Sequence, residues 1–297
     1  MKYTKPSVSI PNQIATLKAR GLIFTNEQSA ENYLSHISYY RLRAYTYPFQ
    51  DNSDPAHPFT SQVTFEQIIQ LYVFDRKLRL LIFDAIEKVE IAMRTQIIYH
   101  FSIKHGAFWH INAALYHDSM RFANQLTSLQ TEINRSKETF IDHYKNTYTT
   151  PSDPPCWMAL EVSSMGLLSQ IFQNLRHSEE KKTIARHFGI TDVRIFENWM
   201  FCFCNLRNIC AHHGRVWNRR LVKITIPYNT RNEFINNLNV YPNKLYATLA
   251  CLSYILNIIS PQNDFKQRLK DIIGNCPMLQ EHEMGFPLNW EEDAFWS

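Results

Sequence analysis

Residues 64–106 read TFEQIIQLYVFDRKLRLLIFDAIEKVEIAMRTQIIYHFSIKHG and carry the longest helical pattern in the chain. Thr64 opens the pattern, and Gln67 three residues later completes a capping box, in which both side chains bond to exposed backbone amides. Apolar residues then recur at alternating spacings of three and four, which marks one buried helix face. The pattern ends near His105-Gly106. We therefore predict one very long helix, or two helices joined by a bend, in an essentially all-α protein.

Helical patterns of ordinary length flank this segment on both sides. We find no succession of alternating strand-like segments, and the chain has only seven glycines. The expected helices cover residues 14–20, 27–37, 119–135, 138–145, 155–162, 167–175, 179–187, 241–259 and 264–273, together with one that begins after Asp192. Residues 51–58, rich in Asp, Asn, Ser and Pro, form a predicted loop. We expect a small N-terminal helical lobe over residues 1–60 and a larger helical domain over residues 61–297.

Composition and charge exclude several classes of protein. The chain has 297 residues, of which 45% are hydrophobic, so it can bury a sizeable core. Its formal net charge of +4 permits an RNA partner without proving one. Residues 1–20 lack the pattern of a signal peptide, and no apolar run approaches the length that spans a bilayer. We therefore expect a cytoplasmic protein without a membrane segment.

The cysteines do not indicate a disulfide framework or a metal site. Six cysteines are too few for such a framework in a chain of this length, so we expect reduced, packed side chains. A zinc site built from Cys202, Cys204, Cys210, His212 and His213 has suitable ligand types. However, Cys202 and Cys204 point about 160° apart around a helix, so they would not bind one ion. We expect no metal and no cofactor.

The candidate chemical centre is the segment Arg207–Arg215, which reads RNICAHHGR. It ends a helix that Thr191-Asp192 caps and whose buried face is marked by regularly spaced apolar residues. Arg207 occupies the next position of that face. We therefore expect a buried guanidinium, which requires an anionic partner such as a carboxylate or a phosphate. Gly214 lies where helices often end on a left-handed residue, and we expect that conformation there.

Arg207 and His212 form a pair suited to cleaving RNA without a metal. A guanidinium binds phosphate and stabilises charge on a pentavalent phosphorus, while a histidine transfers the proton of the 2′-hydroxyl or of the leaving 5′-oxygen. Asn208, one turn before His212, would orient its ring or contact the phosphate. The two side chains diverge by about 140° on an ideal helix. The site therefore requires the long arginine stem, unwinding before Gly214, or a second chain. The alternative is an internally paired arginine beside histidines that cap the helix.

These residues fit the Arg-x4–6-His signature of HEPN domains, and the chain more widely resembles the Abi-like subfamily. The Tyr-x-Phe-Asp-Arg-x-Leu-Arg segment of that subfamily is matched by residues 72–79, and the pattern that follows it is matched by residues 86–94. Its RN-x-CAHH-x-R-x-WNR pattern is matched from Arg207 to Arg219, and its tail by residues 284–290. The resemblance spans most of the chain.

The resemblance implies a HEPN-type helical bundle with long antiparallel core helices. It also implies a metal-independent endoribonuclease that leaves 2′,3′-cyclic phosphate and 5′-hydroxyl ends, with Arg207 and His212 as catalytic residues and Asn208 in support. His213 is an alternative histidine, because the signature tolerates a longer spacing. In such proteins the cleft forms where two motifs face each other, so we expect a homodimer.

The biological role implied by the resemblance is abortive infection, a phage defence in which a cell damages its own RNA, or action as a toxin. An antitoxin, either a small structured RNA or a protein, would then be a partner. The alternative is a non-catalytic HEPN protein that binds RNA, senses a phage component or acts as a scaffold.

Carboxylates of the long helix would support the site. Glu87, Glu90 and Arg94 lie at helical spacing, and we hypothesise that Glu90, with Glu87 as a second candidate, holds Arg207 in place. The alternative is an exposed Glu90–Arg94 pair that adds little stability.

Two basic groups are candidates for guiding single-stranded RNA. One is the strip just past the motif, formed by Arg215, Arg219, Arg220 and Lys223. The other is the aromatic and basic run of residues 38–45, for which a solvated helix face with inward tyrosines is the favoured interpretation.

Overall fold

The computed structural model describes residues 2, 6–227, 230, 234–235 and 240–297. Over these residues the protein is all-α, with twelve α-helices, short 3-10 turns and no β pairing beyond isolated bridges. The predicted fold class is confirmed. The chain divides into two compact units, Met1–Arg79 with Leu269–Gln280 and Leu80–Arg268 with Glu281–Ser297. The dividing point lies inside the long helix, whereas the sequence placed a boundary near residue 60.

The first unit begins with three short helices, α1 (Ile10–Ala19), α2 (Glu27–His36) and α3 (Tyr39–Thr46), followed by a 3-10 turn at Tyr47–Phe49. Asn26 and Ser38 cap α2 and α3 by accepting backbone N–H groups. The aromatic and basic run forms α3, in which Tyr45 is buried but Tyr40 is exposed. Its tyrosines are therefore not all turned inward.

The long segment forms a single helix, α4 (Phe65–His105). The capping box is present, since the Thr64 amide donates to Gln67 Oε1 at 2.9 Å and the Gln67 amide donates to Thr64 Oγ1 at 3.2 Å. No glycine or proline interrupts residues 65–105, so nothing forces a bend. Gly106 ends the helix in the left-handed region, with φ of +84°. Of the two predicted alternatives, one continuous helix is correct.

The part of α4 in the first unit carries a buried polar network. Asp75 is fully buried, and its carboxylate accepts a hydrogen bond from the Tyr45 hydroxyl at 2.6 Å and from Arg79. Burial and the Asp75 carboxylate raise the pKa of Tyr45, which therefore stays protonated as a donor. Because both the Tyr45 hydroxyl and the Arg79 guanidinium contact Asp75, the charge of this buried carboxylate is compensated.

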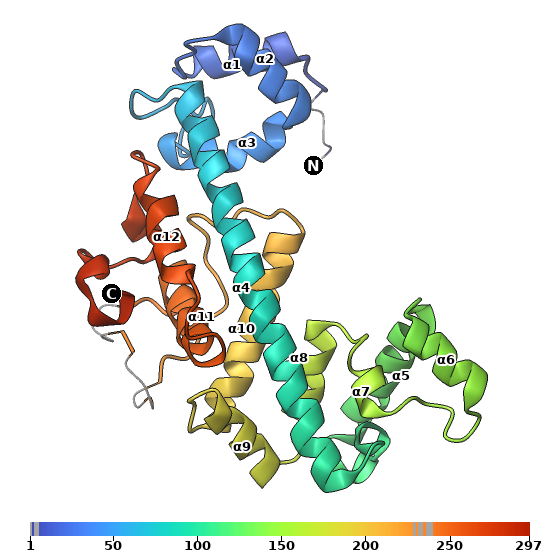
Figure 1. The fold of residues 1–297 in the computed structure, drawn as a ribbon. Helices are drawn as coiled ribbons and strands as arrows, with labels where there is room; N and C mark the ends of the chain where they lie inside the picture. The colour runs from blue at the N-terminus through green and yellow to red at the C-terminus, as the bar shows by residue number, and fades with distance from the viewer. Residues whose placement is uncertain (1, 3–5, 228–229, 231–233, 236–239) are drawn as a thin grey trace. The chain divides into compact units, whose positions relative to one another are not determined.

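The second unit is built around α10 (Val193–Ala211), whose N-terminus Asp192 caps. Three helices pack on α10: α8 (Met165–Asn174), α9 (Glu179–His187) and α11 (Leu245–Ile259) (Figure 1). Residues 245–256 of α11 are buried on all sides, as expected for a helix that is apolar all round. α4 runs antiparallel to α10 where they meet, since Phe83 lies against Arg207 and Glu90 acts on Cys204.

The remaining helices are α5 (Ser119–Arg135), α6 (Thr139–Thr147), α7 (Cys156–Ala159) and α12 (Phe265–Gly274), with 3-10 turns at Trp109–Ile111, Ala113–Leu115, Glu281–Met284, Trp290–Glu292 and Ala294–Trp296. Two of these predictions were too long. The helix predicted over 155–162 is only α7, which ends at Ala159 and is followed by a turn in which the Ser163 amide donates to the Leu160 carbonyl at 3.1 Å. The helix predicted from residue 241 begins at Leu245, after a turn in which the Lys244 amide bonds to the Tyr241 carbonyl.

All six cysteines are buried, as expected of packing residues. Burial raises the pKa of the Cys202 thiol to about 12 and that of the Cys156 thiol to about 11. Among the described helices, none is both long and apolar enough to cross a membrane.

Candidate active site

Helix α10 remains intact through the motif. Ala211 is its last helical residue, and His212 is the C-cap, whose amide donates to the Asn208 carbonyl at 3.0 Å. Unwinding therefore does not bring Arg207 and His212 together, and their divergence of about 140° persists. Of the three routes to a joint site, the long arginine stem and a second chain remain.

The left-handed residue at the helix end is His213, with φ of 56°, so the prediction for Gly214 was wrong. Helix α10 ends at Ala211, so the left-handed residue comes one position earlier than Gly214. The His213 amide donates to the Cys210 carbonyl at 3.0 Å and the Gly214 amide to the Ile209 carbonyl at 2.8 Å, the bond pattern of a Schellman motif. Gly214 instead allows the chain to pass close to Ile209. A Cβ at this position would lie only 3.2 Å from both the Ile209 carbonyl oxygen and the Ile209 Cγ2 atom.

Arg207 is half-buried, and its guanidinium lies 5.6 Å from the centroid of the Phe83 ring on α4. Its Nη1 donates to Asn208 Oδ1 at 3.4 Å. No carboxylate in the described part of the chain forms an ion pair with it. The prediction of a buried guanidinium was therefore wrong, because the Arg207 side chain is only partly covered where it lies against Phe83. Stacking on an aromatic ring fixes the guanidinium while leaving its edge for an anion.

Asn208 and His212 lie on the solvent face of α10, one turn apart. Phe201 and Asn205 lie on the same face at helical spacing, and Phe201 is 45% exposed. The Asn208 Nδ2 atom approaches Cys204 Sγ at 3.8 Å. Asn208 thus contacts both the Arg207 guanidinium and the Cys204 thiol of its own helix.

Glu90 pairs with Arg94 at 2.7 Å, and Arg94 also donates to the Ser163 carbonyl at 2.9 Å. The pair is formed, but it is nearly buried rather than exposed, with side-chain exposures of 14% and 10%. Glu90 makes no direct ion pair with Arg207 within the described residues. The pKa of Cys204 is raised by burial first and then by the Glu90 charge, while the Arg207 charge lowers it. Both charges therefore act on the same thiol. Glu87 is exposed.

The basic strip begins beside the motif and leads away from it. The Arg215 guanidinium lies 5.7 Å from the centroid of the Trp217 indole, and Arg219 Nη1 donates to the Arg215 carbonyl at 3.3 Å. Arg219, Arg220 and Lys223 are exposed. The Lys223 carbonyl accepts a bond from Asn198 at 3.2 Å, so the strip returns along α10 toward its N-terminal half.

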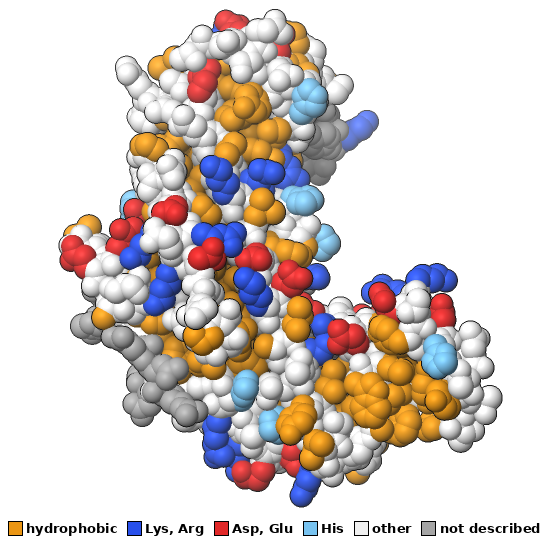
Figure 2. Space-filling model, viewed as in Figure 1, with side chains coloured by type: hydrophobic (Ala, Val, Ile, Leu, Met, Phe, Trp, Pro, Cys, Tyr) orange, Lys and Arg blue, Asp and Glu red, His pale blue; other side chains and the backbone are white. Residues whose placement is uncertain are grey.

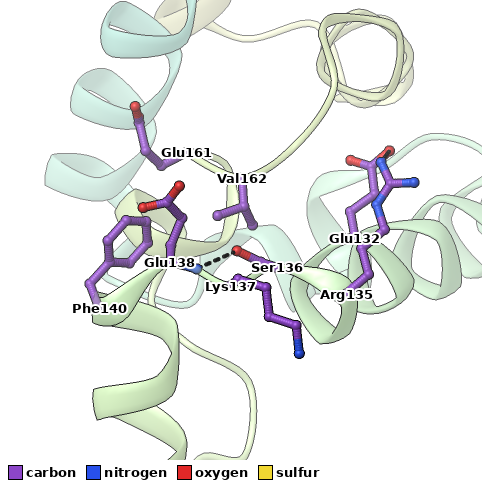
Figure 3. Close-up of a pocket in the computed structure, with 8 residues that line it drawn as sticks. All are labelled: Glu132, Arg135, Ser136, Lys137, Glu138, Phe140, Glu161 and Val162. Carbon is purple, nitrogen blue, oxygen red and sulfur yellow. Dashed lines mark hydrogen bonds and ion pairs between the residues drawn. The ribbon is translucent and has the colours of Figure 1, made fainter.

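A cavity of about 570 Å³ lies elsewhere in the second unit, around the α5–α6 turn and the residues after α7 (Figure 3). The cavity is lined by side chains of both charges, acidic Glu138 and Glu161 and basic Arg135 and Lys137. Glu132 is already engaged, since its carboxylate accepts bonds from the Ser164 amide at 2.7 Å and hydroxyl at 2.9 Å. This cavity could not be predicted from the sequence, because the residues that line it come from separate elements and share no motif. Its lining includes no histidine or cysteine.

Comparison with known proteins connects the chain to one family. The family model described as Abi-like protein matches residues 32–218, which include all of α4 and α10. No curated protein and no solved structure matches the chain. Within the described residues, no group of three or more His, Cys, Asp or Glu side chains is arranged to hold a metal ion.

Proposed function

Since the chain belongs to the Abi-like protein family, a group linked to abortive infection, we propose that it is a metal-independent endoribonuclease of the HEPN type. The observation that carries the proposal is the end of α10. There an arginine without a carboxylate partner among the described residues stacks on Phe83, beside an exposed amide and an exposed histidine. A half-exposed guanidinium held in this way is suited to binding a phosphate.

The proposed reaction is attack of the ribose 2′-oxygen on the adjacent phosphorus. One histidine accepts the 2′-hydroxyl proton as the new phosphorus–oxygen bond forms, and another donates a proton to the leaving 5′-oxygen as its bond breaks. The products are a 2′,3′-cyclic phosphate and a 5′-hydroxyl. Arg207 stabilises the charge on the pentavalent phosphorus. Asn208 positions the guanidinium through their hydrogen bond, and His212 moves the protons.

The proposed active form is a homodimer. Because α10 is intact, Arg207 and His212 of one chain point about 140° apart. A two-fold axis near the end of α10 would instead bring His212 of one subunit toward Arg207 of its partner, and it would supply two histidines to one cleft. The exposed Phe201 on the His212 face supports a partner there. The role we propose is phage defence or toxicity, restrained by an RNA or protein antitoxin.

The test compares wild type with His212→Ala, Arg207→Ala and the matched control His213→Ala. Each is incubated with end-labelled single-stranded RNA in excess chelator, and the product ends are mapped. We expect cyclic-phosphate products from wild type and His213→Ala, with cleavage reduced by about 100-fold or more in the other two variants. If His212→Ala cleaves RNA as well as wild type and His213→Ala does not cleave it, the proton-transfer role belongs to His213. Undiminished cleavage by all variants would overturn the proposal.

A second candidate function is RNA binding without cleavage, which the exposed cations Arg219, Arg220 and Lys223 favour. It predicts equal RNA affinity for wild type and His212→Ala, and no cleavage by either. It also predicts that Lys223→Gln weakens RNA binding and reduces its salt dependence.

A further inference from the structure

The outer face of α3, in the first unit, presents two exposed tyrosines. Tyr40 is 85% exposed, and Tyr47, which follows α3 directly and keeps helical dihedrals, is 48% exposed. Seven residues make almost two full turns of a helix, so both rings lie on one face, about 10 Å apart along the axis. Arg43 lies between them, three residues after Tyr40. We call these three residues the α3 tyrosine face.

The packing of α3 does not account for Tyr40 and Tyr47. The other two tyrosines of the same run are engaged, because the buried Tyr45 hydroxyl donates to Asp75 at 2.6 Å and the Tyr39 hydroxyl accepts a bond from Arg20 at 2.9 Å. By contrast, the rings of Tyr40 and Tyr47 form no aromatic pair with any described residue, and their hydroxyl groups form no hydrogen bond there. Both rings are therefore available to stack on a ligand.

The unit that carries this face is positively charged. Residues 1–79 and 269–280 include ten Lys or Arg and seven Asp or Glu, so this unit has a formal charge of +3, most of the +4 of the whole chain. Figure 2 shows Lys and Arg side chains gathered over α3 and the neighbouring part of α4. Exposed Arg76 belongs to that part of α4, one turn after Tyr72, whose ring contacts Tyr45 at 5.4 Å between centroids. An anionic ligand fits such a surface.

The arginine of the face is not neutralised by a carboxylate. Arg43 Nη2 lies 3.3 Å from His57 Nε2, and Arg43 forms no ion pair within the described part of the chain. The acids of the following loop are turned to their own loop, since Asp51 and Asp54 each accept a bond from a backbone amide two residues later. A guanidinium has five N–H donors, so Arg43 retains donors for a phosphate.

We propose that the α3 tyrosine face binds single-stranded RNA, with one base stacked on Tyr40, another on Tyr47 and a phosphate between them on Arg43. A single strand is required, because only unpaired bases offer their faces to aromatic rings. The two rings are about 10 Å apart, whereas stacked bases follow each other at about 3.4 Å. The strand therefore binds in an extended form. Stacking tolerates any base, so this face holds the strand without selecting its sequence.

The choice of RNA rather than DNA rests on the proposed ribonuclease function, whereas the stacking geometry does not. Arg207 and His212 belong to the other unit, so the α3 tyrosine face takes no part in the bond cleavage. Its contribution is affinity for the strand. The two proposals can therefore fail separately.

The first experiment measures the affinity of the full chain for a labelled 2′-O-methyl RNA single strand by fluorescence anisotropy. This probe lacks the free 2′-hydroxyl, so the proposed reaction cannot consume it, and binding is measured whether or not the chain is a ribonuclease. We expect Tyr40→Ala and Tyr47→Ala to bind about fivefold or more weakly than wild type. Tyr40→Phe keeps the ring and should bind as wild type does.

The matched control is Tyr99→Ala, because Tyr99 is a 56% exposed tyrosine on α4 in the second unit. It should leave the affinity unchanged, and all variants should unfold at the temperature of wild type, since the altered side chains are exposed. A duplex of the same sequence should bind more weakly and should not respond to Tyr40→Ala. Equal binding of the single strand by Tyr40→Ala and wild type would overturn the proposal, as would tighter binding of single-stranded DNA than of the RNA probe.

The second experiment locates the bound strand. A 2′-O-methyl strand that contains 4-thiouridine is crosslinked to wild type by light, and the crosslinked peptides are identified by mass spectrometry. We expect crosslinks within residues 39–47. Crosslinks confined to residues 207–223 would overturn the proposal, because the strand would then be held by the motif and the basic strip alone. If crosslinks form within residues 39–47 but wild type cleaves no RNA, the ribonuclease proposal fails and the binding face stands.

Discussion

At the scale of single residues, the end of α10 shows local strain beside the proposed chemistry. His213 occupies the left-handed region with φ of 56°, where glycine is the usual residue. A side chain in that conformation costs about 1 kcal/mol relative to glycine. Strain of this kind is often retained where it positions a functional group. Here it turns the chain sharply after His212, so that the basic strip returns along α10.

The first prediction concerns this strain. His213→Gly should raise the free energy of unfolding by about 1 kcal/mol, because glycine adopts the left-handed conformation without a steric penalty. Urea denaturation followed by tryptophan fluorescence would measure it. Asn218→Gly is the control for backbone effects in this loop, since Asn218 also has a positive φ, of 45°. A destabilised His213→Gly variant would show instead that the contacts of the imidazole outweigh the backbone strain.

At the scale of elements, one nearly buried ion pair joins α4 to the residues before α8. The Arg94 guanidinium joins Glu90 of its own helix to the Ser163 carbonyl. Removing one partner of a buried pair leaves a charge without compensation, which is costlier than losing an exposed pair. The pair therefore contributes to stability, and its carboxylate acts on the same Cys204 thiol as the Arg207 charge.

The second prediction tests this pair. Glu90→Ala should lower the free energy of unfolding by about 3 kcal/mol, because it leaves Arg94 unpaired. Glu90→Gln keeps a hydrogen-bond acceptor and should lose less. Exposed Glu87→Ala is the matched control on the same helix and should have little effect. Equal stability of all three variants would show that the pair contributes nothing, and normal cleavage by folded Glu90→Gln would exclude a role in holding Arg207.

The elements themselves were largely predictable because their signals are local. The Thr64–Gln67 capping box, the apolar period and the absence of helix breakers determine α4, and Asp192 determines the start of α10. Helix ends were harder to predict. The helix predicted over 155–162 ends in a turn after Ala159 that no glycine or proline marks. The end of α10 depends on His213, which adopts a left-handed conformation that glycine usually takes.

The site was predicted less completely than the elements, because it depends on which helices meet. The sequence indicates that Arg207 follows an apolar stripe, but only packing against α4 shows that Phe83 supports the guanidinium and leaves it half-exposed. Likewise, a small cavity whose lining includes Leu206 of α10 and Thr248 of α11 exists only because those two helices meet. No spacing along the chain predicts that meeting.

At the scale of the whole molecule, the unfolding of the second unit can be followed by the fluorescence of its own tryptophans. All six tryptophans of the chain lie within Leu80–Arg268 or Glu281–Ser297, so tryptophan fluorescence follows the unfolding of that unit.

The second unit also contains a buried histidine, His110, which is 3% exposed and whose two ring nitrogens have no hydrogen-bond partner. Burial lowers the pKa of His110 to about 4, although the Asp153 charge opposes this shift.

The third prediction follows from the depressed pKa of His110. An unfolded histidine takes up a proton near pH 6.5, whereas His110 in the folded unit stays neutral to about pH 4. As the pH falls through this window, the unfolded state binds the extra proton, so the free energy of unfolding decreases by up to about 3 kcal/mol. His110→Phe removes that proton site and the unpaired nitrogens. Its stability should therefore fall less than that of wild type between pH 6.5 and pH 4.5, when urea unfolding is followed by tryptophan fluorescence. Exposed His143→Gln is the control and should follow wild type. Parallel pH profiles for wild type and His110→Phe would show that His110 is protonated in the folded state, and hence that water reaches its ring.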